Sequence, residues 1–175
     1  MSDAEPELFD VPYERFLDEV ETLALAIGAD RWQPDFLVGI GRGGLVPAAY
    51  LSHRTGIQML SVDHSSGEVG FGDELLDKLA AKIRAGSNIL IVDDINDSGG
   101  TIQYLRAAIG AKIDDPSGLR VAVLVHNVRS RAEAEYHGSE IDRELDKRWY
   151  VFPWEAVAPR STLKVEALAV PERLA

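Results

Sequence analysis

Short apolar runs that alternate with amphipathic helical segments constrain this sequence more than any other feature. Apolar runs predict buried strands at 36–40, 58–63, 88–93 and 119–126, with a shorter strand at 148–152. Apolar residues at helical spacing, together with helix start signals, predict helices over 12–28, 45–54, 74–84 and 100–108. Apolar strands separated by helices are typical of a parallel sheet that is covered on both faces. The sequence therefore predicts an α/β fold, a mostly parallel sheet flanked by helices, in a single domain spanning 1–175.

The stretch ILIVDDINDSGGT at 89–101 places an unusual polar cluster directly after one predicted strand. Asp93 and Asp94 are adjacent and Asp97 follows three residues later. Adjacent carboxylates repel each other, more strongly when buried, so the pair either caps the next helix or binds a cation or hydroxyl groups. Mg²⁺ prefers such oxygen ligands, and the hydroxyls of a ribose are a second candidate.

The second half of this stretch is built to bind an anion. Two glycines let the backbone approach a ligand closely, two hydroxyls add donors, and a helix begins here with its positive dipole end. The residues concerned are Ser98, Gly99, Gly100 and Thr101. Next to the acids, this loop predicts a site for a phosphorylated ribose.

The same thirteen residues resemble the phosphoribosyl-diphosphate binding signature of the type I phosphoribosyltransferases. The resemblance implies that Asp93 and Asp94 bind the ribose 2- and 3-hydroxyls and Mg²⁺. It also implies a catalytic role for Asp97 beside the reacting base, and it assigns the 5-phosphate to the loop 98–101.

A second glycine-rich segment follows the predicted strand at 36–40. Its residues, Gly41, Arg42, Gly43 and Gly44, resemble the loop with which this family grips pyrophosphate. Arg42 would offer a forked donor to the leaving group, which is a catalytic role. The segment 39–44 also satisfies G-x-G-x-x-G, with Asp63 about 20 residues further on, as in dinucleotide-binding oxidoreductases. That alternative leaves the acids at 93–97 unexplained.

The stretch RWYVFPWE at 148–155 resembles the purine-binding end of the 6-oxopurine transferases, the xanthine-guanine and hypoxanthine-guanine enzymes. The resemblance implies that Trp149 stacks on the base and that the Tyr150 backbone reads its edge, whereas Trp154 is expected to pack in the core. An aromatic residue at a strand start is commonly a core residue, so that reading of Trp149 stays open. The family usually has a base-reading Lys at the end of the preceding strand. Here His126 occupies the nearest position, either as a base-binding donor or as a structural histidine.

Composition limits the partners of this protein. The net charge of −11 argues against a nucleic-acid partner, and no apolar run approaches the roughly 20 residues that span a bilayer. The absence of cysteines excludes disulfides and thiolate metal sites. From composition we expect a cytoplasmic protein. The resemblance implies that it binds phosphoribosyl diphosphate, Mg²⁺ and a purine base and forms a homodimer or homotetramer. The N- and C-terminal segments are expected to form a small base-binding hood, and the glycine-rich loop at 64–73 to close over the site.

Three functions follow from these observations. The first is transfer of the phosphoribosyl group to guanine, xanthine or hypoxanthine in purine salvage. The second is a regulator that retains the phosphoribosyl-diphosphate pocket without the transfer, and the third is the dinucleotide-dependent oxidoreductase.

Overall fold

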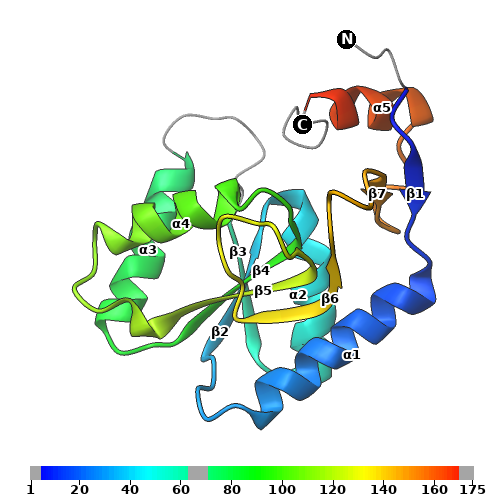
Figure 1. Cartoon of the computed structure of the whole chain (residues 1–175). Helices are drawn as coiled ribbons and strands as arrows, with labels where there is room; N and C mark the ends of the chain where they lie inside the picture. Colours follow the sequence, from blue (N-terminus) through cyan, green and yellow to red (C-terminus); the bar gives the residue numbers. More distant parts are fainter. Residues whose placement is uncertain (1–4, 63–70, 170–175) are drawn as a thin grey trace.

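A computed structural model describes residues 5–62 and 71–169 and shows a central sheet between two layers of helices (Figure 1). In this part of the chain, five strands pair in the order β3-β2-β4-β5-β6, and every pair is parallel. The strands are β2 (Phe36–Ile40), β3 (Gln58–Val62), β4 (Ile89–Asn96), β5 (Leu119–Asn127) and β6 (Tyr136–Ile141). The predicted parallel α/β fold is confirmed.

The helices cover both faces of this sheet, as Figure 1 shows. Helices α1 (Tyr13–Ala29) and α2 (Gly41–Thr55) pack on one face, and α3 (Phe71–Arg84) and α4 (Gly100–Gly110) on the other. Because successive strand residues point to opposite faces, each strand supplies two apolar cores. Leu37, Leu90 and Leu124 pack under α1 and α2, whereas Val38, Ile91 and Val123 pack under α3 and α4. Full burial of each such side chain contributes about 1.5–3 kcal/mol.

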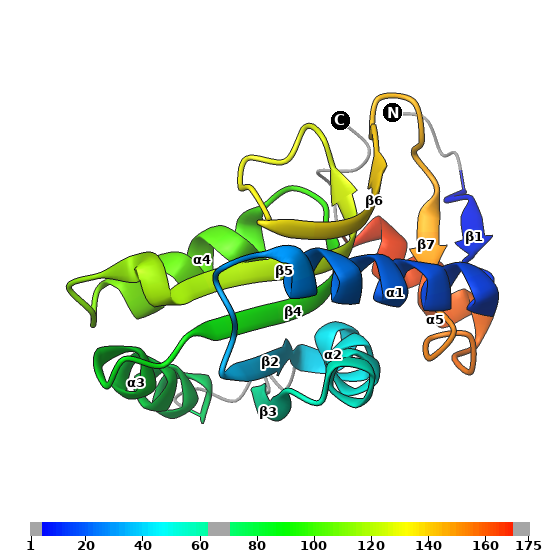
Figure 2. The same cartoon turned by 90° about the horizontal axis from the view of Figure 1, so that it is seen from below.

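A second, smaller sheet joins the two ends of the described chain. Strand β1 (Leu8–Asp10) pairs in parallel with β7 (Trp149–Val151), and α5 (Arg160–Leu168) follows. In Figure 2, β1 and β7 lie side by side beyond the end of the main sheet. Arg160 forms an ion pair with Asp10, and Lys164 Nζ lies 2.5 Å from Glu5 Oε1. The sequence analysis placed β7 correctly but did not predict β1, β6 or α5.

Several predicted boundaries were wrong. Helix α2 begins at Gly41, so the segment 41–44, expected to be a loop, forms its first turn. Strand β4, predicted to end at Asp93, continues to Asn96 because its backbone stays paired with β5 as far as His126, so Asp94 also lies within the strand. Helix α3 begins at Phe71, three residues inside the segment expected to be a loop. The rest of that segment, 64–70, and Asp63 lie outside the described residues.

Within the described residues, no helix combines the length and the apolar character needed to cross a membrane.

Candidate active site

A cavity of about 430 Å³ opens at the carboxyl ends of β2 and β4. One wall runs from Ile40, the last residue of β2, to Gly43 in the first turn of α2, and another is formed by Asp93, Asp94 and Thr101. The segment from Trp154 to Glu166, which includes part of α5, closes the third side. Part of each segment predicted to bind one end of a sugar diphosphate lines this cavity, namely 41–43 of the first and Thr101 of the second. The volume is typical of small-ligand sites.

The first turn of α2 packs directly against β4. A Cβ atom added to Gly43 would lie 2.5 Å from Asp94 Oδ2, and one added to Gly44 would overlap the carbonyl oxygen of Val92. Gly41 has a φ of 57°, in the left-handed region that favours glycine. Gly43 and Gly44 are therefore required for close contact with β4, and Gly41 for its backbone conformation, which explains why residues of poor helix propensity stand at the start of α2.

The paired acids are held by local backbone contacts. The Asp94 amide donates to Asp93 Oδ1 at 3.0 Å, and the Ile95 amide donates to Asp94 Oδ1 at 2.7 Å. Burial raises the pKa of Asp93 well above its usual value, and the adjacent Asp94 charge raises it further. A bound cation would relieve this repulsion. Two carboxylates in an open cavity fit Mg²⁺, which is commonly held by one or two carboxylates together with water and substrate phosphates.

Most of the charged residues that line the cavity are acidic. Among the described residues that line it, Asp93, Asp94, Glu155 and Glu166 are acids and Arg42 is the one base. The Arg42 side chain is 83% exposed, and its Nη2 lies 3.6 Å from Glu166 Oε1 on α5. Arg42 and the paired acids thus line the same cavity.

The predicted phosphate loop is held in place by hydrogen bonds from the end of β5 and from the connection between β5 and β6. Asn127 Nδ2 donates to the Asp97 carbonyl at 3.0 Å, and the Arg131 amide donates to the Ser98 carbonyl at 3.2 Å. Gly99 has a φ of 89°, and a Cβ there would lie 2.7 Å from the Ala132 amide nitrogen. Helix α4 begins at Gly100, and Thr101 faces the cavity. The first turn of α4 thus offers N–H groups and a positive dipole end to an anion.

Asp97 is bound by an arginine that the sequence analysis did not single out. Arg143 Nε donates to Asp97 Oδ1 at 2.9 Å, and Arg143 Nη2 donates to Asp97 Oδ2 at 3.0 Å. No local signal identified Arg143, because its surroundings, EIDRELDKRW, have the mixed charges of a solvated loop. Of the described residues, those that line the cavity do not include Asp97.

Tyr150 is buried in β7, and its backbone orientation is informative. The Trp149 amide donates to the Glu7 carbonyl at 2.7 Å, and the Val11 amide donates to the Val151 carbonyl at 2.9 Å. Alternate residues of a strand bond to the same neighbour, so the N–H and C=O of Tyr150 face away from β1. Among the described residues, however, those that line the cavity include neither Trp149 nor Tyr150.

His126 lies in a buried polar cluster, and among the described residues it does not line the cavity. Its Nδ1 lies 3.0 Å from Asn96 Nδ2, which can only donate, so Nε2 carries the proton of the neutral ring. The ring stacks on His137 with a centroid distance of 5.3 Å. Burial lowers the pKa of His126, and His137 lowers it further, so the ring is neutral at pH 7. The predicted base contact would therefore use Nε2, and it stays a prediction.

Trp154 packs in the core as predicted, stacked on Phe152 with a centroid distance of 5.0 Å. It also lines the cavity, which the sequence analysis did not anticipate.

A parallel α/β sheet with paired acids and two glycine-rich helix starts at its carboxyl edge defines a class of sugar-phosphate or nucleotide-binding proteins. The phosphoribosyl transferase domain matches residues 12–158, and this chain belongs to that family. It is 30% identical over 123 residues to a xanthine-guanine phosphoribosyltransferase of Gluconobacter oxydans (strain 621H), which covers 68% of this chain and 67% of that protein.

Two solved structures show the same fold. One is the Helicobacter pylori xanthine-guanine-hypoxanthine phosphoribosyltransferase, with a TM-score of 0.65, 20% identity, and coverage of 92% of this chain and 99% of that chain. The other is a hypothetical protein from Neisseria gonorrhoeae with bound ppGpp, with a TM-score of 0.66, 22% identity, and coverage of 96% and 99%.

Proposed function

We propose that this protein transfers the phosphoribosyl group of phosphoribosyl diphosphate to guanine, xanthine or hypoxanthine and releases pyrophosphate, as a step of purine salvage. The observation that carries the proposal is the convergence of the α2 start and the acids of β4 on one cavity. A sugar diphosphate has charged groups at two ends and hydroxyls between them, and its binding here is supported by the presence of Arg42, the two acids and Thr101 in the lining of the same cavity. Membership of the family and the similarity to a xanthine-guanine enzyme support the same activity.

The donor would lie across the carboxyl ends of β2 and β4. Its 5-phosphate binds the loop of Ser98, Gly99, Gly100 and Thr101 at the start of α4. Its pyrophosphate binds the backbone N–H groups of 41–44, and Arg42 turns from Glu166 to the phosphates. Asp93 and Asp94 bind the ribose hydroxyls and Mg²⁺, which when bound neutralises charge that develops on the leaving group.

The base would lie beside β7. Trp149 stacks on the purine, the Tyr150 backbone pairs with its edge, and His126 Nε2–H is the predicted donor to its 6-oxo group. A purine nitrogen attacks the anomeric carbon while the bond to pyrophosphate breaks. Asp97 accepts or steers the proton that the attacking purine must lose. The N- and C-terminal segments, with β1, β7 and α5, would form the hood over this site.

Measurement of pyrophosphate release tests the proposal. The protein is incubated with Mg²⁺, phosphoribosyl diphosphate and each common base, and turnover with one 6-oxopurine is expected. Asp97→Ala should slow transfer strongly yet still bind the donor. Donor binding without turnover on any base would favour the regulator, and no donor binding in the presence of Mg²⁺ would refute the proposal. We expect the protein to be cytoplasmic. We also expect a homodimer or a homotetramer, and sedimentation equilibrium distinguishes the two by their mass.

A further inference from the structure

We infer that Arg143 is a positioning residue that fixes the Asp97 carboxylate relative to the base-binding strand β7. This inference rests on the proposed phosphoribosyl transfer and assigns a role to a residue outside the family signature.

The contact between Arg143 and Asp97 is the most constrained ion pair in this region. Two parallel N–H···O bonds, of 2.9 and 3.0 Å, fix both the distance and the plane of the carboxylate. Both side chains are largely buried, with 8% of the Arg143 and 18% of the Asp97 side chain exposed. Water therefore has little access to replace these hydrogen bonds, and the two side chains are held in one relative orientation.

The same guanidinium also binds the segment that leads into β7. Arg143 Nη1 donates to the carbonyl oxygens of Asp146, at 3.1 Å, and Arg148, at 2.7 Å. Its guanidinium carbon lies 5.2 Å from the centre of the Tyr150 ring, within cation–π range. Arg143 therefore contacts the proposed proton acceptor, the residues that precede β7, and Tyr150 of the proposed base-binding pair.

A second contact reinforces this connection. Asn127 Oδ1 accepts from the Arg143 amide at 3.3 Å, while Asn127 Nδ2 donates to the Asp97 carbonyl at 3.0 Å. The backbones of Asp97 and Arg143, 46 residues apart, are thus held to the same side chain at the end of β5. A surface ion pair has no such additional hydrogen bonds to the backbones of both partners.

The chemical consequence is orientation of Asp97 toward the base. A carboxylate can accept more than two hydrogen bonds, so pairing with Arg143 is compatible with acceptance from a purine N–H. Because Arg143 also fixes the approach to Trp149 and Tyr150, a purine held on β7 meets the carboxylate at a set distance. A displacement of about 1 Å in such a geometry can cost about a hundredfold in rate.

A double-mutant cycle tests this role. Arg143→Met keeps the side-chain volume and removes the fork, and Asp97→Asn removes the charge. We expect Arg143→Met to lower kcat between about tenfold and a hundredfold, with a change in KM for the donor below about threefold. Added to Asp97→Asn, the same substitution should cost less than about twofold more, because Arg143 acts through Asp97. Arg143→Lys, which cannot form the fork, should recover only part of the rate.

Controls separate positioning from stability. Arg129→Met removes an exposed neighbouring arginine that pairs with Asp142, and it should leave kcat unchanged. Circular dichroism checks folding of each variant, and if Arg143→Met is unfolded the cycle is completed with Arg143→Lys. Effects that multiply in the double variant would overturn the inference while leaving the transfer activity in place. Absence of turnover by the wild-type protein would overturn the proposed function itself, and the inference with it.

Discussion

Gly43 and Gly44 are adjacent in the sequence, but their replacement by alanine should have different consequences: one lowers donor affinity and the other lowers stability. The three atoms nearest to a Cβ on Gly43 all belong to the Asp94 side chain, with Oδ2 at 2.5 Å and Cγ at 2.8 Å. A Cβ on Gly44 would meet the backbone of β4, including the Val92 carbonyl carbon at 3.1 Å and Asp93 Cα at 3.2 Å. A carboxylate can rotate away, but a paired central strand cannot.

The magnitudes follow from what has to move. Overpacking against a rigid neighbour costs about 1–3 kcal/mol, so Gly44→Ala should lower the melting temperature by roughly 2–12 °C in a chain of this length. For Gly43→Ala, alanine is the better helix former by about 0.5–1 kcal/mol, which offsets part of the clash and leaves stability nearly unchanged. The displaced Asp94 should, however, weaken Mg²⁺-dependent donor binding by at least about tenfold, or 1.4 kcal/mol.

Thermal unfolding and calorimetric titration with phosphoribosyl diphosphate, with and without Mg²⁺, measure the two effects. Gly28→Ala is the matched control, because Gly28 lies on the exposed face of α1 with no atom within 4 Å of an added Cβ. That variant should be slightly stabilised and bind the donor normally. Wild-type donor affinity in Gly43→Ala, or wild-type stability in Gly44→Ala, would refute the claim that α2 packs on β4 through these glycines.

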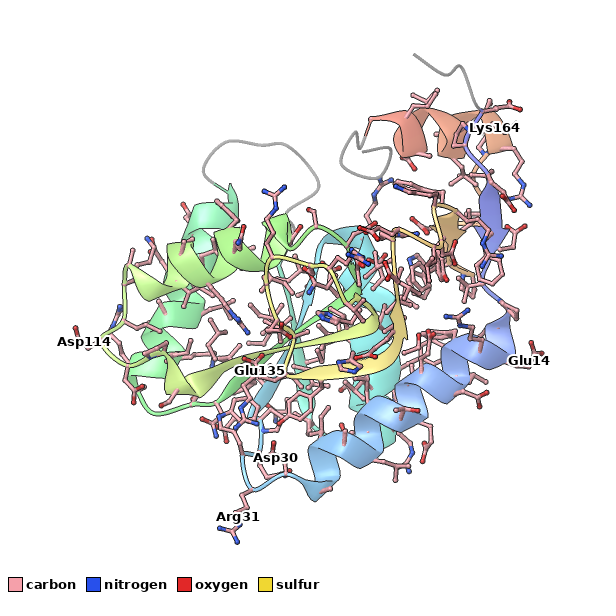
Figure 3. All side chains as sticks on the ribbon, in the orientation of Figure 1. Glu14, Asp30, Arg31, Asp114, Glu135 and Lys164 are labelled. Carbon is pink, nitrogen blue, oxygen red and sulfur yellow. The ribbon has the colours of Figure 1, made fainter. Side chains whose placement is uncertain are left out.

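Two further predictions concern charges. The Trp32 amide, Arg120 and Tyr136 lower the pKa of Asp30 to about 2 from 3.8, so Asp30 contributes stability above pH 4 that is lost as the pH falls through about 2. Asp30→Asn should therefore reduce the urea midpoint of unfolding by more at pH 7 than at pH 3, and an equal reduction at both pH values would contradict this. Because Asp30 lies far from Lys164 of α5 (Figure 3), the substitution should have no effect on donor binding. Glu166→Gln should tighten donor binding about two- to fivefold, because an exposed ion pair of up to about 1 kcal/mol no longer competes for Arg42. Calorimetric titration at two salt concentrations checks this, and weaker binding would show that Glu166 helps to bind the donor.

Local patterns were sufficient for four strands of the main sheet, including the edge strand β3, but not for the edge strand β6 or for β1 of the small sheet. The runs that became β2, β4 and β5 are apolar enough to be recognised as buried strands. Strand β6, with the sequence YHGSEI, carries no such pattern and is a strand because β5 offers it a partner. Strand β1, of three residues, likewise exists only through its pairing with β7. Both strands form because a partner strand is available, and for β1 that partner lies at the other end of the described chain.

The sequence by itself determined the α/β class, the order of its central elements and the two glycine-rich segments, because apolar periodicity and helix start signals act within a few residues. Tertiary structure alone decided that Gly44 lies against Val92, that α5 brings Glu166 to Arg42, and that Arg143 binds Asp97. These contacts join segments tens of residues apart, and packing of the whole chain selects them. No local pattern encodes which polar side chain will be buried opposite which charge, since the free energy of such a contact depends on desolvation and geometry that only the folded chain sets.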